Sequence, residues 1–145
     1  MVENEDIFSL VLGFCLFPPA AYAKVLLIDI EGIRSANGYL MLAACSREEY
    51  RGETSGCSIQ LRHAAVKGHV MLSLEVPENT MIALKVYHDE NANNKLDTGL
   101  FARPLEGYGF SNNATARFGI PDFDKAAFSV ENNTTTKQLS ITLNY

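Results

Sequence analysis

Apolar and polar residues alternate along most of the chain from Val25 onward. Successive side chains of a strand point to opposite faces, so this period of two predicts half-buried β-strands. The alternation also predicts strands over 39–45, 57–65 and 127–130, and a weaker one over 115–119. It is clearest in four sets of apolar residues, each expected on one face of its strand: Leu26, Ile28 and Ile30; Val70, Leu72, Leu74 and Val76; Ile82, Leu84 and Val86; and Leu139, Ile141 and Leu143.

Short polar turns separate the predicted strands. Residues 35–38, Ser-Ala-Asn-Gly, have the composition of a hairpin turn. Farther along the chain, Pro77 ends the predicted strand that contains Val70 to Val76. Only residues 122–127 have a pattern that fits even one helical turn. Seven or eight short strands without a full helix are typical of an all-β protein. The sequence therefore predicts a single antiparallel β-sandwich, Ig-like or prealbumin-like, in one domain over residues 24–145.

The first 23 residues have a different pattern, which predicts a secretory signal peptide. Residues 7–17 are uncharged and mostly apolar, prolines follow, and Ala21-Tyr22-Ala23 forms a small-x-small cleavage site. The apolar run is too short to span a bilayer, and we expect no transmembrane segment after cleavage. The alternative is an ordinary apolar N-terminal helix or strand. A signal peptide would place the protein in the periplasm or outside the cell.

The charge of the chain argues against nucleic acid as a partner. The formal net charge is −5, the isoelectric point is about 5.1, and no basic block is present. Nucleic-acid binding requires clustered Lys and Arg that neutralise phosphates. The sequence identifies no other partner.

Polar residues at ligand-like spacing directly follow the strand that contains Ile82, Leu84 and Val86. Asp89, Asn91, Asn93 and Asp97 occupy positions 1, 3, 5 and 9 of an oxygen-ligand calcium loop, and the backbone carbonyl of Lys95 occupies position 7. Alternate residues of a tightly wound loop point inward, so a hard cation can collect an oxygen from each. The sequence therefore predicts a Ca²⁺ site at residues 89–97.

Two positions in this loop depart from the pattern of calcium loops. Asn94 stands where such loops have Gly, although Asn also tolerates left-handed backbone. Leu100 stands where they have a bidentate Glu. With only two carboxylates, the expected dissociation constant lies in the range of about 10⁻⁴–10⁻³ M. The alternative is an Asx-rich turn whose side chains bond their own backbone.

Two cysteines remain after the expected cleavage, Cys45 and Cys57. They end one predicted strand and begin the next, and an oxidising compartment would allow them to form a disulfide. The alternative is two separate small core residues.

The histidines lack zinc-ligand spacing. His88 falls on the apolar face of its strand, where a core histidine is the usual case, and it neighbours Asp89 closely enough to support a metal ligand. The segment Gly107-Tyr108-Gly109-Phe110 predicts a loop in which the glycines adopt unusual backbone angles and the rings fold back onto the sandwich. The other interpretation is an aromatic surface for a carbohydrate or peptide, formed by His88, Tyr108, Phe110 and Asn112.

Two motifs resemble those of a known bacterial family of exported proteins, the domain of unknown function 2141. They are His-Asp-Glu-Asn-x-Asn-x-Lys-Leu-Asp over 88–97 and Glu-Gly-Tyr-Gly-Phe-Ser-Asn-Asn over 106–113. The resemblance covers roughly residues 24–145 and implies a secreted or periplasmic β-sandwich without a defined activity. The first motif is also similar to the loops of calcium-stabilised adhesin repeats, which share a prealbumin-like sandwich but end in an acid where this chain has Leu100.

Three functions fit these observations. The first is a non-enzymatic exported domain, structural or binding, with a weak Ca²⁺ ion in the 89–97 loop and no other cofactor. The second is a metal-dependent hydrolase with His88, Asp89 and Asp97 around an open site, although the sequence designates no catalytic residue. The third is a binding protein that holds a carbohydrate at the 88–113 segment or a small apolar ligand between the sheets.

Overall fold

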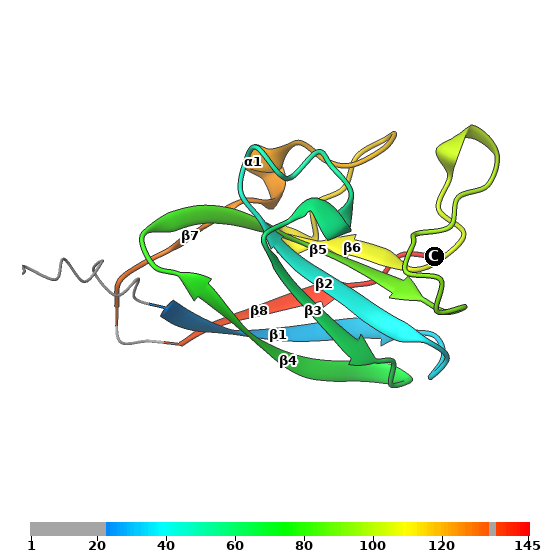
Figure 1. Cartoon of the computed structure of the whole chain (residues 1–145), viewed down its shortest axis with the longest axis horizontal. Coiled ribbons are helices and arrows are strands. Elements are labelled where there is room, and N and C mark those ends of the chain that lie inside the picture. Colours follow the sequence, from blue (N-terminus) through cyan, green and yellow to red (C-terminus); the bar gives the residue numbers. More distant parts are fainter. Residues whose placement is uncertain (1–22, 134–135) are drawn as a thin grey trace, which may run out of the picture.

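A computed structural model of the chain, which describes residues 23–133 and 136–145, shows two β-sheets packed face to face (Figure 1). The predicted all-β sandwich is confirmed. The expected signal peptide falls on residues outside the described range, apart from Ala23, the first residue of the first strand. Within the described ranges, no helix is long and apolar enough to cross a membrane.

The connections between successive strands vary in length, and the two longest join β5 to β6 and β6 to β7. They are β1 (Ala23–Ile33), β2 (Tyr39–Cys45), β3 (Ile59–Ala64), β4 (Gly68–Pro77), β5 (Thr80–Asp89), β6 (Tyr108–Phe110), β7 (Phe128–Val130) and β8 (Lys137–Thr142). The helical pieces are α1 (Phe123–Ala126) and the 3-10 turns η1 (Thr54–Gly56), η2 (Leu100–Ala102) and η3 (Ser111–Asn113).

One sheet has three strands in the order β4-β1-β8, and the other has the order β3-β2-β5-β6, with β7 paired to the start of β5. All pairs are antiparallel except β1 and β8, which run parallel with Ile28 opposite Leu139. The parallel pair departs from the predicted antiparallel arrangement. It arises because the chain returns from β7 to the end of the molecule where β1 begins (Figure 1).

Three local predictions were wrong. The turn at 35–38 does not close a hairpin, because β1 and β2 lie in different sheets and the turn carries the chain between them. Residues 115–119 form no strand, since they are exposed and pair with no neighbour. Tyr108–Phe110, predicted as loop, is a strand that pairs with Lys85 to Tyr87 of β5.

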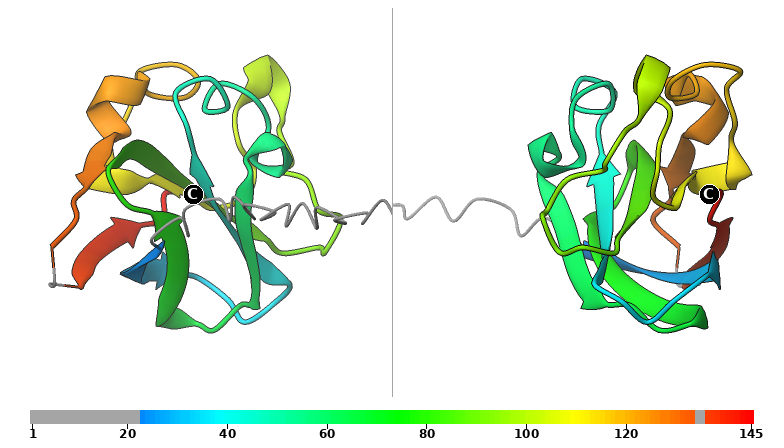
Figure 2. Two further views of the ribbon diagram at one scale, coloured as in Figure 1. Left: turned by 60° about the vertical axis from the view of Figure 1, so that its left-hand side comes forward. Right: turned by 90° about the vertical axis from the view of Figure 1, so that its right-hand side faces the viewer.

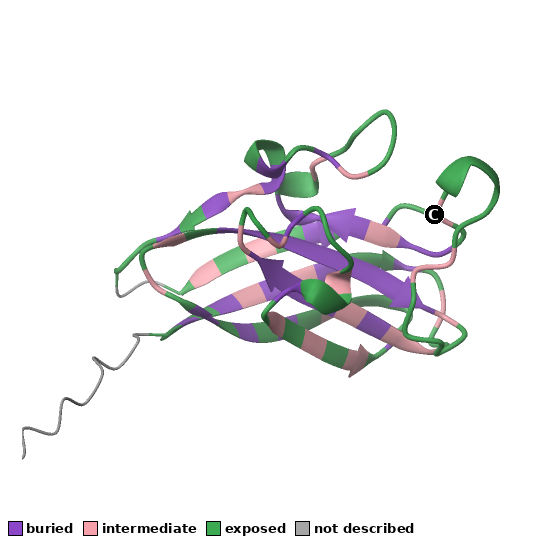
Figure 3. Ribbon diagram, turned by 45° about the horizontal axis from the view of Figure 1, so that its top comes forward, coloured by how far each residue is buried: buried purple, intermediate pink, exposed green. Residues whose placement is uncertain are grey.

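The main core fills the space between the sheets and contains the apolar sets that the period of two predicted. Its side chains alternate with exposed ones along β1 and β4, as the banding in Figure 3 shows. The fully buried members include Leu26, Ile28, Ile30, Leu40, Leu42, Leu84 and Ile141.

A second cluster covers the outer face of the five-stranded sheet. The loop between β2 and β3, together with α1, packs there around Tyr50, whose ring lies edge-on to Phe110 and Phe123 at centroid distances of 6.2 and 5.4 Å. Burial raises the pKa of Tyr50 to about 12. Because of this cover, β5 is buried on both faces from Ile82 to Asp89.

A disulfide and a buried lysine hold the covering loop. Cys45 and Cys57 form a disulfide across it. The buried ammonium of Lys85 reaches it from β5, and its Nζ donates to the carbonyl oxygens of Tyr50 and Gly52 at 2.9 and 2.6 Å. Burial lowers the pKa of Lys85, and the two carbonyl oxygens offset part of the hydration that its ammonium group loses.

Replacing both Cys45 and Cys57 by Ser should destabilise the fold. The disulfide closes a loop with a sequence separation of 12, and loop-closure entropy predicts a loss of about 3 kcal/mol. Urea denaturation of both proteins measures the difference. Reductant should lower the midpoint of the natural protein and leave that of the double variant unchanged; equal midpoints without reductant would contradict the prediction.

Candidate functional site

The polar loop starts where β5 ends, at the fully buried carboxylate of Asp89. Its Oδ1 accepts the backbone N–H of Asn93 at 3.0 Å and its Oδ2 accepts that of Asn94 at 2.8 Å. A buried carboxylate must be hydrogen-bonded to offset its lost hydration. The first turn of the loop is therefore wound around Asp89.

This winding requires left-handed backbone at two residues. Ala92 has φ 57° and Asn94 has φ 62°. Asn94 thus adopts the conformation that a Gly would supply at this position, which Asn tolerates better than most residues.

The remaining predicted ligands are joined to one another by hydrogen bonds. The side-chain amide of Asn93 donates to both carboxylate oxygens of Asp97, at 2.9 and 3.1 Å. The side-chain amide of Asn91 donates to Oδ2 of the same carboxylate at 2.5 Å. The N–H of Lys95 donates to Asn93 Oδ1 at 2.9 Å. The structure therefore brings Asp89, Asn91, Asn93, Lys95 and Asp97 into one turn, bonded internally as in the Asx-turn alternative.

Glu106 supports this turn, although the spacing of residues in the sequence predicts no role for it beyond its place in a motif. Its carboxylate is buried; Oε1 accepts the N–H of Glu90 at 2.9 Å and Oε2 accepts the N–H of Asp97 at 3.0 Å. One side chain thus ties together the two ends of the 89–97 loop. An acid so far along the chain from Asp89 has no local spacing signal that would identify it.

Glu90 fastens the loop to the connection between β1 and β2. The Nε of Arg34 donates to both oxygens of Glu90, at 3.0 and 3.1 Å, and the Ser35 hydroxyl donates to Oε1 at 2.9 Å. These hydrogen bonds, chiefly those of Arg34, lower the pKa of Glu90 below its ordinary value. The loop is therefore held at its start by a neighbouring segment as well as by its own bonds.

His88 is fully buried and both of its ring nitrogens have partners. Nε2 lies 2.7 Å from the carbonyl oxygen of Asn37, and Nδ1 lies 2.8 Å from the Tyr145 hydroxyl. A carbonyl oxygen only accepts, so Nε2 carries the proton and Nδ1 accepts from Tyr145 in the neutral ring. Neither ring nitrogen is free to bind a metal or to act as a base. The hydrogen bonds of the His88 ring are made to Asn37 and Tyr145, and none is made to Asp89.

Gly107 and Gly109 of the 106–113 motif are needed because neighbouring atoms leave no room for a Cβ, and not because the backbone has unusual angles there. A Cβ at Gly107 would lie 2.4 Å from the Tyr145 ring, and one at Gly109 would lie 2.6 Å from Ile141. Neither glycine is among the residues with positive φ. The expectation of unusual angles was therefore wrong, and the physical reason for Gly here is that β6 lies directly against the end of the chain.

The expected aromatic surface is not available as a platform. His88 and Phe110 are buried, and Tyr108 is half-buried beside Phe110. The exposed Asn112 uses its amide nitrogen to donate to the carbonyls of Lys125 and Ala127, at 3.1 and 3.0 Å. These four residues anchor β6 and η3 to the sandwich and do not form an open face.

A hollow of about 380 Å³ lies on the outer face of the sheet, between η1 and Asn94 of the polar loop. Met41, Leu61 and Tyr87 are among the residues that line it. Burial, with the nearby carboxylates of Asp89 and Glu106 adding to it, raises the pKa of Tyr87 to about 12. The Tyr87 side chain is thus neutral at any physiological pH, and the hollow contains no ionised nucleophile.

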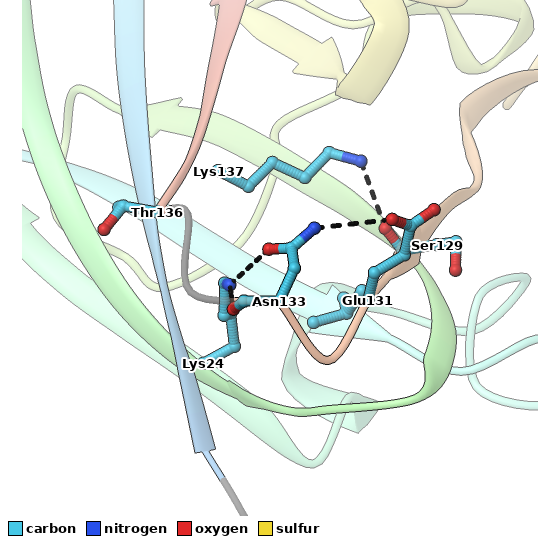
Figure 4. Close-up of a pocket in the computed structure, with 7 residues that line it drawn as sticks. Lys24, Ser129, Glu131, Asn133, Thr136 and Lys137 are labelled. Carbon is cyan, nitrogen blue, oxygen red and sulfur yellow. Dashed lines mark hydrogen bonds between the residues drawn. The ribbon is translucent and has the colours of Figure 1, made fainter.

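A second hollow, of about 200 Å³, lies between the start of β1 and the β7–β8 connection (Figure 4). Its two lysines are already engaged: Lys24 donates to the backbone and side-chain oxygens of Asn133, and Lys137 donates to the Ser129 carbonyl at 3.1 Å. This cationic site therefore serves to hold the connection.

Replacing Glu106 by Ala should loosen the polar loop. The N–H groups of Glu90 and Asp97 would lose their acceptor, and an unpaired buried group costs about 1–3 kcal/mol. Hydrogen exchange should accelerate at these two amides. Glu106→Gln, which keeps one acceptor oxygen, should give a smaller effect and the exposed Glu75→Ala none; unchanged exchange in Glu106→Ala would contradict the role given to this carboxylate.

Replacing Gly107 by Ala should destabilise the protein through its clash with Tyr145, by about 1–3 kcal/mol as for other overpacked sites. The cost should fall sharply in a Tyr145→Ala background, where the ring is absent. A double-mutant cycle of unfolding free energies measures this coupling. Equal costs in the two backgrounds would show that backbone geometry, and not contact with the ring, selects Gly107.

Comparison with known proteins identifies one family. The family model described as "Uncharacterized protein conserved in bacteria (DUF2141)" matches residues 28–138, which covers β2 to β7 and most of β1. No curated protein and no solved structure matched. Since the match extends over most of the chain and includes both motifs around the polar loop, this protein belongs to the bacterial DUF2141 family.

Proposed function

We propose that the protein is a non-enzymatic exported domain whose 89–97 loop binds Ca²⁺ weakly and is stabilised by it. The observation that carries this proposal is the gathering of two carboxylates and two side-chain amides in one turn, at Asp89, Asp97, Asn91 and Asn93.

The donor set fits a hard cation. Carboxylate, amide and backbone carbonyl oxygens are the ligands that Ca²⁺ takes in proteins, six to eight at a time. The loop offers side-chain oxygens from Asp89, Asn91, Asn93 and Asp97 and the carbonyl of Lys95, with water for the remainder. The Asn91 and Asn93 amides now present nitrogen to Asp97, and rotation of each amide would present oxygen instead.

The expected affinity is low because only two carboxylates stand at ligand positions, and that of Asp89 already accepts two backbone N–H groups. Leu100 is 84% exposed and has no ligand atom in its side chain. Both oxygens of Glu106 already accept backbone N–H groups. A site with two carboxylates falls in the range of about 10⁻⁴–10⁻³ M, which suits a compartment rich in calcium.

Export is supported by two observations. The pattern of residues 1–23 is that of a signal peptide. The Cys45–Cys57 disulfide is of the kind that persists in oxidising compartments such as the periplasm or the extracellular medium.

The alternatives draw less support from the site. A metal-dependent hydrolase would require a base at this loop, and both nitrogens of His88 are engaged. A carbohydrate-binding face at His88, Tyr108, Phe110 and Asn112 would require open rings there, and Phe110 is buried. We therefore carry only the calcium-stabilised domain forward.

Calcium should raise the melting temperature. At 10 mM Ca²⁺, binding linkage with the expected affinity gives about 1.4–2.7 kcal/mol, or roughly 4–10 °C for a domain of this size. Asp97→Asn, which changes a partly exposed carboxylate, should abolish most of the shift.

Differential scanning calorimetry measures this, with Mg²⁺ and the exposed Glu75→Gln as controls. The same shift with Mg²⁺, no shift with Ca²⁺, or a full shift in Asp97→Asn would overturn the proposed site.

A further inference from the structure

We propose that two loop tips at one end of the sandwich form a docking surface for anionic lipid bilayers. This two-tip surface consists of the apolar side chains of Leu100, Phe101 and Leu105 on the first tip and Phe118 on the second, flanked by Arg103 and Arg117. It is independent of the calcium proposal.

The tips expose large apolar side chains almost completely. Phe101 is 102% exposed, Phe118 86% and Leu100 84%. By contrast, Phe110, Phe123 and Phe128 are 7–8% exposed. Exposed apolar groups gathered at one end of a molecule mark an interaction site, whereas scattered ones do not.

Hydrogen bonds fix the first tip in shape. Thr98 and Pro104 form a β-bridge at its base, the N–H of Gly99 donates to the carbonyl of Arg103 at 2.8 Å, and that of Leu105 donates to the carbonyl of Asp97 at 2.8 Å. A short, closed stem thus presents Leu100 and Phe101 at its end.

The backbone of this tip is in an unfavourable conformation. Phe101 and Ala102 have φ 57° and 56°, which costs energy in residues with a Cβ. Contacts of the Phe101 ring within the protein do not offset this cost in energy, because the side chain is fully exposed. Strain that exposes an apolar ring points to a contact outside the molecule.

The second tip is tied down at its base and projects from the same end of the molecule as the first. The carbonyl oxygen of the Asn113 side chain accepts the N–H of Thr142 at 2.8 Å, and the Asn112 amide bonds to the end of α1. In the three views of Figures 1 and 2, both loops project from the upper end of the molecule, away from β4. A flat surface laid against that end would meet both tips.

The arginines beside the tips favour an anionic bilayer as the binding partner of the two-tip surface. Arg34, Arg47 and Arg51 pair with carboxylates, while no ion pair is found for Arg103 or Arg117 within the described residues. Free arginines beside exposed aromatic rings suit an interface of anionic headgroups over acyl chains. A second copy of this chain, tip to tip, would place these arginines against like charges.

The absence of Trp from the sequence allows a local test. In the full chain, Phe101→Trp and Phe118→Trp each place one reporter on a tip, and Val66→Trp places one on the 45% exposed residue of the β3–β4 turn. Vesicles of phosphatidylcholine with phosphatidylglycerol should shift the emission of the two tip reporters to the blue. Brominated acyl chains should quench them, and Val66→Trp should not respond. The signal is local, so residues 1–22, common to all variants, do not contribute to it.

Vesicle sedimentation tests the energetic contribution. Phe101→Ser with Phe118→Ser should weaken binding at least about tenfold, given the cost of losing two buried aromatic side chains, and Val66→Ser should not. Arg103→Gln with Arg117→Gln should remove the preference over pure phosphatidylcholine vesicles. A tip reporter that does not respond to vesicles overturns the proposal, as does one that shifts with protein concentration alone, which would indicate self-association.

Discussion

The burial of β5 on both faces is the constraint on which the rest of the structure depends. Its inner face, with Leu84 and Val86, belongs to the core between the sheets, and its outer face lies under the loop closed by the disulfide. This burial extends to the C-terminal end of the strand, at Asp89. The carboxylate there cannot be hydrated, so the chain that follows winds around it and satisfies it with its own N–H groups.

Hydrogen bonds within the protein therefore define the shape of the polar loop. Asp89 organises the first turn, Glu106 joins the ends of the 89–97 loop, and the Arg34–Glu90 pair fixes it to the neighbouring connection. A cation at this loop would add to a preformed turn, which explains how a site with only two carboxylates could still be useful. The same rigidity carries through the β-bridge of Thr98 and Pro104 to the exposed tip.

The sequence predicted those features that depend on near neighbours. The period of two identified the sandwich and the inner face of β5. Asp89, Asn91, Asn93 and Asp97, which share a regular spacing, lie in one turn, while their role as ligands stays a prediction. It missed the burial of Lys85 and Tyr87, because the segment that covers them lies far away in the chain. The roles of Glu106 and Gly107 were missed for the same reason, since their partners come from distant residues. An exposed Phe101 could not be distinguished from a core residue by its type.

The most direct test of this account is hydrogen exchange at the amides of Asn93 and Asn94 with calcium removed by a chelator. Both N–H groups donate to the buried Asp89 carboxylate. We expect them to be protected from exchange in chelator, with calcium adding further protection. Exchange at the rate of an unstructured peptide until calcium is supplied would show that an ion, and not the buried carboxylate, shapes the loop.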